Sequence, residues 1–319
     1  MKKIVVLDAG TLGEDLSLAP LNEVGEVTVY RVSSAETVRE RITGADAVIL
    51  NKVKIGEEQL PEVGAPGGAP GIICVAATGF DNIDLDACRK HGVAVANVRG
   101  YSSDSVAQVT VGLVLSLITH LSAYCKATAD GSYTCGGNAN MLVPTYHEIA
   151  GMTWGVVGAG KIGSRVADVA RALGCRVLTN RRTPDGVSVD LETLLRESDI
   201  VTVHTPLTSE TRGLIGEREI SMMKDGVILV NMARGAVTDE AAVAEAVEAG
   251  KIGGLGCDVY SVEPFSESHP YYAIRDRENV LLTPHMSWGA YEARARCLSE
   301  MILNMQAFFA GETRNRVDL

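Results

Sequence analysis

The chain has 319 residues, a length typical of two domains, and 46% of them are apolar. Its formal net charge of −11 argues against a nucleic-acid partner, because phosphate groups require a basic surface. The seven cysteines are odd in number and include no C-x-x-C pair, so neither a disulfide framework nor a zinc site is expected.

The sequence also shows no targeting or membrane signal. A strand-like run begins at Lys3, where a signal peptide would need a long apolar core, and no apolar stretch reaches the length of a membrane span. No group of His, Cys, Asp and Glu residues has the spacing of metal ligands. We therefore expect a cytoplasmic protein without a metal site and without a membrane partner.

Strand-like and helix-like segments alternate over residues 1–98, which is typical of a mostly parallel sheet. The helical patterns are Glu36–Thr43 and Asp84–His91, each followed by a glycine. The candidate strands are Ile4–Leu7, Val27–Tyr30, Ala47–Leu50, Ile72–Val75 and Val93–Ala96.

A long apolar helix is predicted next, from about Ser103 to Leu121. Apolar residues occur on nearly all of its sides, so we expect it to be buried all round, between domains or between subunits. Residues 130–148 contain several glycines and a proline and are expected to be irregular. Two interpretations of that segment stay open: a loop that crosses to another subunit, or a surface excursion.

A second series of strands and helices begins at Thr153, and its six strands match the number in a full dinucleotide-binding sheet. The last helix, about Trp288 to Phe309, has no strand after it and is expected to return to the first domain. The candidate strands are Thr153–Val157, Arg176–Leu178, Ile200–Val203, Val227–Val230, Leu255–Asp258 and Val280–Leu282.

These patterns predict an α/β fold with two doubly wound parallel-sheet domains. We expect a Rossmann cofactor domain formed by residues 99–289. It would be inserted into a flavodoxin-like substrate domain formed by residues 1–98 and 290–319.

The segment after the Thr153–Val157 strand has the spacing of a dinucleotide fingerprint. Gly158, Gly160 and Gly163 form G-x-G-x-x-G, and a helical pattern runs from Ile162 to Leu173. The first glycine permits the tight turn, the second lets the backbone approach a pyrophosphate, and the third lets helix and strand pack closely. The N–H groups at the start of the helix would face the phosphates. The segment predicts a dinucleotide cofactor; the alternative is a glycine-rich turn in an ordinary α/β fold.

The second strand of this domain indicates which dinucleotide binds. An NAD site usually has an acidic residue at the end of that strand, where it accepts hydrogen bonds from the ribose. Here Arg181 and Arg182 follow the strand, and guanidinium groups bind a 2′-phosphate that a carboxylate would repel. Asp185 is close but lies in a Thr-Pro-Asp-Gly turn. We therefore favour NADP(H), with NAD(H) as the alternative if both arginines are solvated loop charges.

Three further segments carry candidate catalytic residues, each just past a strand, where open α/β sheets bind ligands. Arg234 leaves a buried strand and is suited to a planar carboxylate. Glu263 precedes Pro264, which restricts its backbone to an extended conformation. His285 can donate a proton near neutral pH, and a neighbouring carboxylate would orient its ring. Together they predict reduction of a 2-oxo acid, although each residue alone is consistent with a structural role.

The other histidines are ranked lower. His204 follows the Ile200–Val203 strand and is expected to face the adenosine end of the cofactor. Four histidines have no evident partner in the sequence and are interpreted as structural: His91, His120, His147 and His269.

Five motifs occur in a specific order along the chain. They are Gly158–Gly163, His204–Thr208, Asn231–Gly235, Glu263–Pro264 and Thr283–His285. In this order they resemble the D-isomer-specific 2-hydroxyacid dehydrogenases, over almost the whole chain. The resemblance implies a homodimer of two-domain subunits that bind NAD(P) and a small 2-oxo or 2-hydroxy acid. It implies Arg234 as the substrate binder, Glu263 as the partner of the acid/base and His285 as that acid/base.

The resemblance also implies which residues bind the two ligands. Backbone N–H groups of Ala77, Thr78 and Gly79 would hold the substrate carboxylate, as Arg234 and His285 hold the substrate from other positions. At the cofactor, Thr110 would lie near the nicotinamide and Asp258 would contact its carboxamide. The other cofactor-binding residues implied in this way are Lys161, Ile162, Thr205, Pro206 and Ala233.

Within the family, the segment Asn97–Ser102 is most similar to that of glycerate dehydrogenases, also called hydroxypyruvate reductases, although Arg99 replaces the usual proline. We therefore expect NAD(P)H-dependent reduction of hydroxypyruvate or glyoxylate to the D-2-hydroxy acid. Two alternatives stay open: a dehydrogenase for a bulkier 2-oxo acid, and a non-catalytic protein that senses dinucleotides, as some corepressors of this family do.

Overall fold

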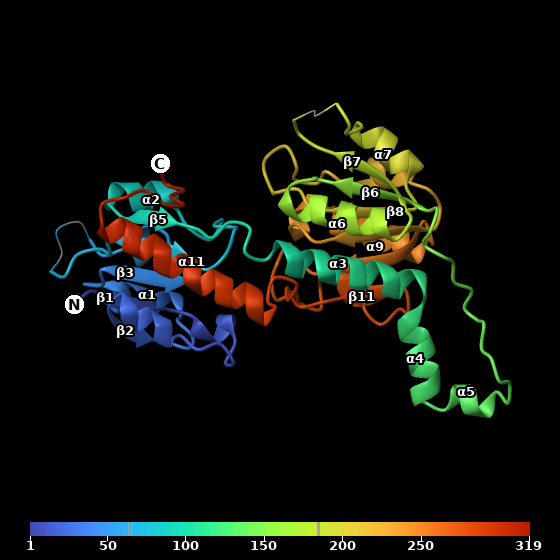
Figure 1. Cartoon of the computed structure of the whole chain (residues 1–319), viewed down its shortest axis with the longest axis horizontal. Coiled ribbons are helices and arrows are strands. Elements are labelled where there is room, and N and C mark those ends of the chain that lie inside the picture. Colours follow the sequence, from blue (N-terminus) through green and yellow to red (C-terminus); the bar gives the residue numbers. More distant parts are fainter. Residues whose placement is uncertain (63, 65, 184–185) are drawn as a thin grey trace. The chain divides into compact units, whose positions relative to one another are not determined.

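The computed structural model describes residues 1–62, 64, 66–183 and 186–319; the turn predicted around Asp185 falls partly outside the described residues. The chain divides into two compact units (Figure 1). Unit 1 contains Met1–Ser102 and Gly289–Leu319, and unit 2 contains Ser103–Trp288. Each unit is built on one parallel β-sheet, so the predicted α/β fold class is confirmed.

The sheet of unit 1 has the strand order β2-β1-β3-β4-β5, and all of its pairings are parallel. This is the flavodoxin-like order. Every strand lies within one residue of its predicted bounds, because each contains a short run of β-branched or apolar residues. The strands are β1 (Lys3–Val6), β2 (Glu26–Val29), β3 (Ala47–Leu50), β4 (Ile72–Val75) and β5 (Ala94–Ala96).

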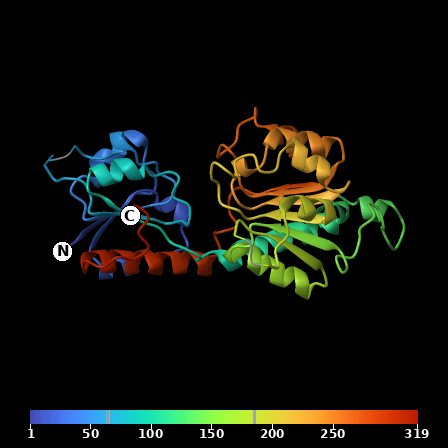
Figure 2. The ribbon, with the colours of Figure 1, turned by 90° about the horizontal axis from the view of Figure 1, so that it is seen from above.

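Alternate residues of these strands face opposite helical layers. Val5 and Ile73 pack in one hydrophobic cluster with Val38 of α1 and Cys88 of α2. The last helix, α11, covers the other face of the sheet (Figure 2). The helices of unit 1 are α1 (Ala35–Ile42), α2 (Leu85–Lys90) and α11 (Tyr291–Phe309), with the 3-10 helices η1 (Ala9–Leu12), η2 (Ala19–Glu23) and η3 (Glu57–Gln59).

The sheet of unit 2 has the parallel order β11-β10-β9-β8-β6-β7. The order reverses between β6 and β8, so a ligand is expected at the carboxyl ends of these two strands. β10 begins three residues earlier than predicted, because glycines with low strand propensity interrupt its apolar pattern. The strands are β6 (Thr153–Val157), β7 (Arg176–Asn180), β8 (Ile200–Val203), β9 (Val227–Asn231), β10 (Ile252–Cys257) and β11 (Val280–Leu282).

Helices cover both faces of this second sheet. Val106 of α3 and Val166 of α6 pack in one cluster with Val156 of β6. On the other face, Val243 of α9 packs with Val201 of β8. The helices are α3 (Ser103–Ile118), α6 (Lys161–Ala172), α7 (Leu191–Glu197), α8 (Glu217–Met222), α9 (Glu240–Glu248) and α10 (Pro270–Ile274), with the 3-10 helix η4 (Gly235–Val237).

The long apolar helix differs from the prediction in two ways. α3 ends at Ile118 and not at Leu121, because His120 adopts a left-handed backbone conformation (φ 49°) that a right-handed helix cannot continue. The helix is also not buried all round, since Asp104 and Gln108 are exposed on one side.

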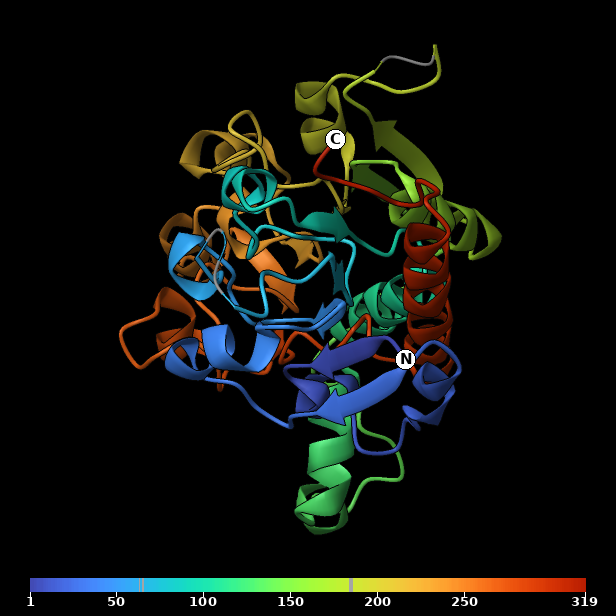
Figure 3. The same ribbon diagram turned by 90° about the vertical axis from the view of Figure 1, so that its left-hand side faces the viewer.

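Two helices that the sequence did not predict follow α3. α4 (Leu121–Ala129) turns by 68° from α3, and α5 (Ser132–Cys135) comes next. Figures 1 and 3 show α4 and α5 extending away from the sheet of unit 2. The prediction that residues 130–148 are irregular is therefore wrong for α5, whereas residues 137–148 contain no helix or strand.

Among the described residues, no single helix has both the length and the apolar character needed to cross a membrane. Only α3 and α4 taken together reach them, and the chain bends sharply between these two helices.

Candidate active site

The glycine turn, residues 158–163, joins β6 to α6 and needs glycine at its motif positions for different reasons. Gly158 has a φ of 87°, and a Cβ added to it would lie 2.6 Å from the backbone nitrogen of Thr205. A Cβ on Gly163 would overlap the carbonyl oxygen of Gly158. In contrast, nothing in the described part of the chain lies within 4 Å of a Cβ added to Gly160. Gly158 and Gly163 are therefore needed for close packing within the turn. Gly160 leaves space beside the backbone, which a pyrophosphate fits.

The first turn of α6 lies beside this open backbone. Lys161 and Ile162 begin the helix, and the Ser164 N–H donates to the Gly160 carbonyl at 2.8 Å. The N–H groups of the residues before Ser164 in the helix have no acceptor within the helix, and such groups attract anions. The residues present therefore fit a dinucleotide.

His204 follows β8 next to the glycine turn. Its N–H donates to the Val157 carbonyl at 2.8 Å, and the segment His204–Pro206 begins against Gly158. Both ring nitrogens are buried, and neither finds a hydrogen-bond partner among the described residues. Burial lowers the pKa of His204 from 6.5 to about 3, so the ring is neutral at pH 7. A buried polar atom without a protein partner is consistent with a ligand group binding at this edge.

The end of β7 carries positive and not negative charge. Arg181 Nη2 donates to Ser164 Oγ at 3.1 Å, so the guanidinium lies against the first turn of α6. Arg182 is exposed. An extra phosphate bound here would meet both the guanidinium and the start of the helix.

The structure brings His285 and Glu263 together. His285 Nδ1 lies 2.6 Å from Glu263 Oε2, and the other carboxylate oxygen, Oε1, accepts from the Tyr260 N–H at 3.0 Å. Both side chains are partly exposed, at 22% for His285 and 29% for Glu263. The carboxylate is thus fixed by its own loop and in turn orients the imidazole.

The backbone of His285 is held by Asp258, a function that the sequence did not predict. His285 has a left-handed φ of 52°, which costs free energy in a residue other than glycine. The buried Asp258 carboxylate accepts from Thr283 Oγ1 at 2.6 Å, Met286 N at 2.9 Å and Ser287 N at 3.0 Å. These three bonds fix the loop on both sides of His285.

Arg234 lies on the neighbouring loop, after β9. Its Nη1 donates to the Ala233 carbonyl at 2.9 Å, and the buried Asn231 side chain bonds both Ala233 N and Arg234 O at 3.0 Å. Gly235 packs so closely on the backbone of Tyr260 that any Cβ there would overlap it. The loop of Arg234 and the loop of Glu263 are therefore in direct contact.

Two further predicted parts of the site are the Ala77–Gly79 loop and Thr110. In unit 1, the Ala77 carbonyl accepts from Val98 N at 3.0 Å, and Thr78 Oγ1 donates to Val98 O at 2.8 Å, so the Ala77–Gly79 loop is tied to the end of β5. In unit 2, the buried Thr110 donates to its own helix, at Val106 O.

The sequence did not predict two pairs of histidine and glutamate side chains. His269 was interpreted as a structural histidine without a partner, but its Nε2 lies 3.0 Å from Oε2 of the buried Glu240. His91 also has a partner, Glu57, at 3.0 Å. No local sequence pattern signals either pair, because the partners are 29 and 34 residues apart.

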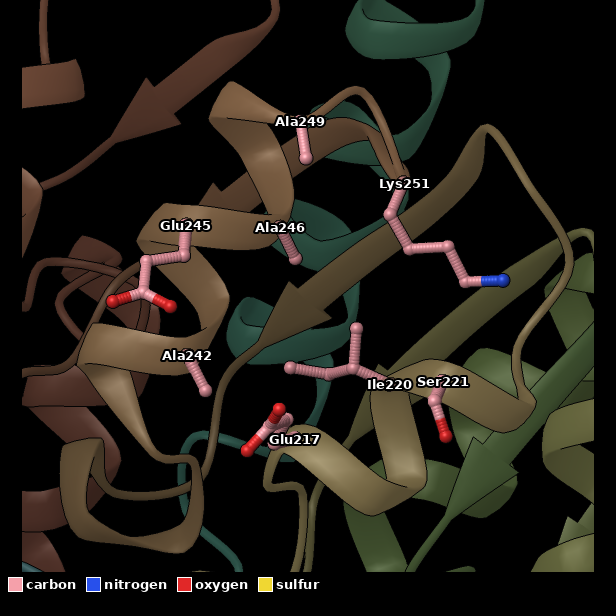
Figure 4. A pocket seen from close by; sticks show the side chains of 8 residues that line it. All are labelled: Glu217, Ile220, Ser221, Ala242, Glu245, Ala246, Ala249 and Lys251. Atoms are coloured by element: carbon pink, nitrogen blue, oxygen red, sulfur yellow. The ribbon is translucent and has the colours of Figure 1, made fainter.

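A surface depression of about 390 Å³ lies between α8 and α9 and contains none of the predicted site residues (Figure 4). No cluster of His, Cys, Asp and Glu side chains suited to a metal ion occurs in the described ranges. The depression is lined by Glu217, Ile220, Ser221, Ala242, Glu245, Ala246, Ala249 and Lys251.

Known proteins are similar to this chain in sequence. The model for the "D-isomer specific 2-hydroxyacid dehydrogenase, NAD binding domain" family matches residues 111–287. The chain is 35% identical to the glycerate dehydrogenase of Methylorubrum extorquens and 31% identical to the hydroxypyruvate reductase of Blautia hydrogenotrophica, with 99% of both chains covered in each case.

Solved structures of other proteins are similar to this chain in fold. An acyclic imino acid reductase in complex with NADPH and D-Arg has a TM-score of 0.85 at 26% identity, with 99% of both chains covered. A D-lactate dehydrogenase from Aquifex aeolicus, complexed with NAD and lactic acid, has a TM-score of 0.82 at 28% identity, with 98% of this chain and 96% of that chain covered.

A doubly wound unit with a glycine turn, and with Arg, Glu and His side chains at its strand ends, defines an oxidoreductase that uses a nicotinamide dinucleotide. The chain belongs to the D-isomer-specific 2-hydroxyacid dehydrogenase family, as its motifs predicted.

Proposed function

We propose that this protein reduces hydroxypyruvate or glyoxylate to the 2-hydroxy acid, with D stereochemistry where the product is chiral. The observation that carries the proposal is the His285–Glu263 pair, 2.6 Å apart, on a loop that contacts the loop of Arg234. The relatives named glycerate dehydrogenase and hydroxypyruvate reductase support the small substrate.

The proton chemistry follows from the orientation of the imidazole. A bound reduced nicotinamide supplies the hydride for the ketone carbon. Because Nδ1 of His285 donates to Glu263, the proton given to the ketone oxygen is the one at Nε2. The Glu263 carboxylate stabilises the imidazolium before this transfer, and the ring ends the reaction neutral.

Charge and hydrogen bonds hold the substrate in place. The Arg234 guanidinium binds the substrate carboxylate and polarises the adjacent carbonyl. From the family resemblance, we propose that backbone N–H groups of Ala77, Thr78 and Gly79 bind the same carboxylate.

The proposed cofactor contacts start from the glycine turn. Its open backbone at Gly160 and the first turn of α6 would hold the pyrophosphate. The further proposed contacts are Thr110, Gly158, Lys161, Ile162, Gly163, Arg181, Arg182, His204, Thr205, Pro206, Ala233 and Asp258.

A matrix of substrates and cofactors tests the reaction. Hydroxypyruvate, glyoxylate, pyruvate and a branched 2-oxo acid are each mixed with NADH and with NADPH, and absorbance is followed at 340 nm. We expect kcat/KM for hydroxypyruvate or glyoxylate to exceed that for the branched acid by about tenfold or more. Equal values would favour the dehydrogenase for bulky acids, and no turnover with any acid would favour the dinucleotide sensor.

We further propose that NADPH is the preferred reductant. The position of Arg181 against α6 and the absence of an acidic residue at the end of β7 support this preference. Arg181→Ala is expected to weaken NADPH binding about tenfold or more and to leave NADH binding nearly unchanged, because only the 2′-phosphate bonds the guanidinium. Arg196→Ala, at an exposed arginine of α7, is the matched control. Equal weakening of both cofactors would contradict the preference.

We also propose that the protein is a homodimer held by residues 119–148. Leu121, Leu142 and Val143 expose 53%, 72% and 73% of their surfaces, so this segment offers apolar surface that a second copy of the chain would cover. Sedimentation equilibrium is expected to give twice the mass of one chain, and Leu142→Asp combined with Val143→Asp is expected to give the monomer. A wild-type monomer would contradict the proposal.

A further inference from the structure

Glu240, Ser261 and His269 form a hydrogen-bonded cluster at the loop of unit 2 that carries Glu263. Glu240 Oε1 accepts from Ser261 N at 2.9 Å, and Oε2 accepts from Ser261 Oγ and from His269 Nε2, the latter at 3.0 Å. Glu240 and His269 are 8% and 9% exposed. The carboxylate is thus buried with three donors, which compensates for the loss of its hydration.

The direction of the His269 bond is fixed by the helix that follows it. His269 is the N-cap of α10, and its Nδ1 accepts from the Tyr271 N–H at 3.1 Å. Because Nδ1 accepts, the ring proton is on Nε2, which therefore donates to Glu240. His269 and Ser261 act only as donors toward this carboxylate.

Glu240 bonds the loop that carries Glu263 and lies on the segment that follows the loop of Arg234. Ser261 lies between Tyr260, whose N–H holds Glu263, and Glu263 itself. Glu240 begins α9, three residues after the η4 turn that follows Arg234. Its bonds to Ser261 therefore fasten the Glu263 loop to the segment that follows Arg234.

We propose that Glu240, with His269 behind it, is a positioning residue that sets the Glu263 carboxylate against His285. This inference rests on the proposed function only in naming the reaction affected. A merely structural cluster would join α9 to α10 and affect stability, without any effect on the titration or turnover of His285.

Glu240→Gln is the principal test. The side chain keeps its size, but an amide has one acceptor oxygen and an NH₂ donor, so it cannot accept from all three donors. We expect kcat for reduction to fall about tenfold to a hundredfold, because small misplacements of a reacting group have effects of this size. KM for the 2-oxo acid and Kd for the cofactor should stay within about twofold, since the buried Glu240 is not among the proposed ligand contacts.

Proton NMR titration of the histidine signals provides a second measurement that needs no turnover. His285→Asn identifies the His285 signal in the wild-type spectrum. We expect the pH midpoint of that signal to move to lower pH in Glu240→Gln, because the carboxylate that stabilises the charged ring is displaced.

Two variants protect the test against a failure to fold. Ser261→Ala removes one donor at a less buried position, and His269→Asn keeps an N-cap for α10 but cannot reach Glu240. Both should change the His285 midpoint in the same direction as Glu240→Gln. Glu245→Gln, an exposed position on the same helix, is the matched control and should change neither measurement (Figure 4).

The outcomes are separable. If Glu240→Gln and the two backup variants leave kcat and the His285 midpoint unchanged, the proposal is overturned, whatever happens to the unfolding temperature. If the wild-type protein reduces no 2-oxo acid but the midpoint still moves, the positioning role stands and the proposed function fails.

Discussion

His285 is constrained at two points that serve different purposes. Asp258 holds its loop in a left-handed backbone conformation that histidine adopts only at a cost, and Glu263 bonds its ring. A side chain fixed in this way loses little freedom when a substrate binds, which favours proton transfer over a short distance.

Substitution of His285 tests its proposed role as the proton donor. His285→Ala is expected to lower kcat for reduction by about a hundredfold or more, because general acid catalysis contributes at least that much. Cofactor affinity, measured by fluorescence titration, should change less than about twofold. Unchanged turnover would remove His285 from the mechanism.

The positions of the candidate side chains after strands could be predicted from the sequence, whereas the bonds that support them could not. Arg234, Glu263 and His285 follow three strands that the sequence shows clearly. The donors to Asp258 lie 25 to 29 residues away and come within reach only because β10 and β11 pair with Cys257 opposite Leu282. Register of this kind is a property of the folded sheet and not of any local pattern.

At the scale of elements, the glycines of the turn between β6 and α6 have different functions: one is needed for folding and another for the proposed binding of the cofactor. Gly163 is needed for packing, whereas a Cβ on Gly160 would meet nothing within 4 Å in the residues described. Gly160 also has an ordinary φ of −76°.

Substitutions at these two glycines test the difference. Gly160→Ala is expected to leave the free energy of unfolding nearly unchanged but to weaken cofactor binding about tenfold or more, since the methyl group occupies the approach of the pyrophosphate. Gly163→Ala should lower the free energy of unfolding by about 1–3 kcal/mol through its overlap with Gly158. Calorimetry with and without cofactor measures both. Equal loss of stability in the two variants would contradict this division.

Element boundaries show where sequence patterns stop being informative. The strands could be predicted because runs such as Ile200–Val203 consist of β-branched residues. The end of α3 could not, because the apolar pattern continues through Leu121 while the left-handed His120 breaks the helix. The short helices α4 and α5 could not be predicted either, because only Ala127 of α4 and no residue of α5 is buried, so neither helix has a buried apolar stripe.

At the scale of the whole molecule, the buried His204 makes stability depend on pH. Its pKa is lowered to about 3 in the folded state, against 6.5 for the exposed group. As pH falls below 6.5, the unfolded chain binds a proton that the folded chain does not, so the free energy of unfolding decreases down to about pH 3.

This linkage can be measured by replacing His204. Between pH 7.5 and pH 5, His204 should lower the free energy of unfolding of the cofactor-free protein by about 2 kcal/mol. In His204→Gln, which cannot titrate, the decrease over the same interval should be smaller by that amount. Denaturant unfolding at the two pH values provides the measurement, and identical decreases would show that His204 is not the group responsible.

The discontinuity of unit 1 has a consequence for how the protein is made. Val95 exchanges backbone and side-chain bonds with Val317 and Asp318, both at 2.9 Å, whereas unit 2 is formed by one uninterrupted stretch. On the ribosome, the first five strands emerge early but wait for α11, with one apolar face uncovered. We therefore expect nascent chains to depend on chaperones through their earliest segment, while the later-synthesised unit completes its folding first.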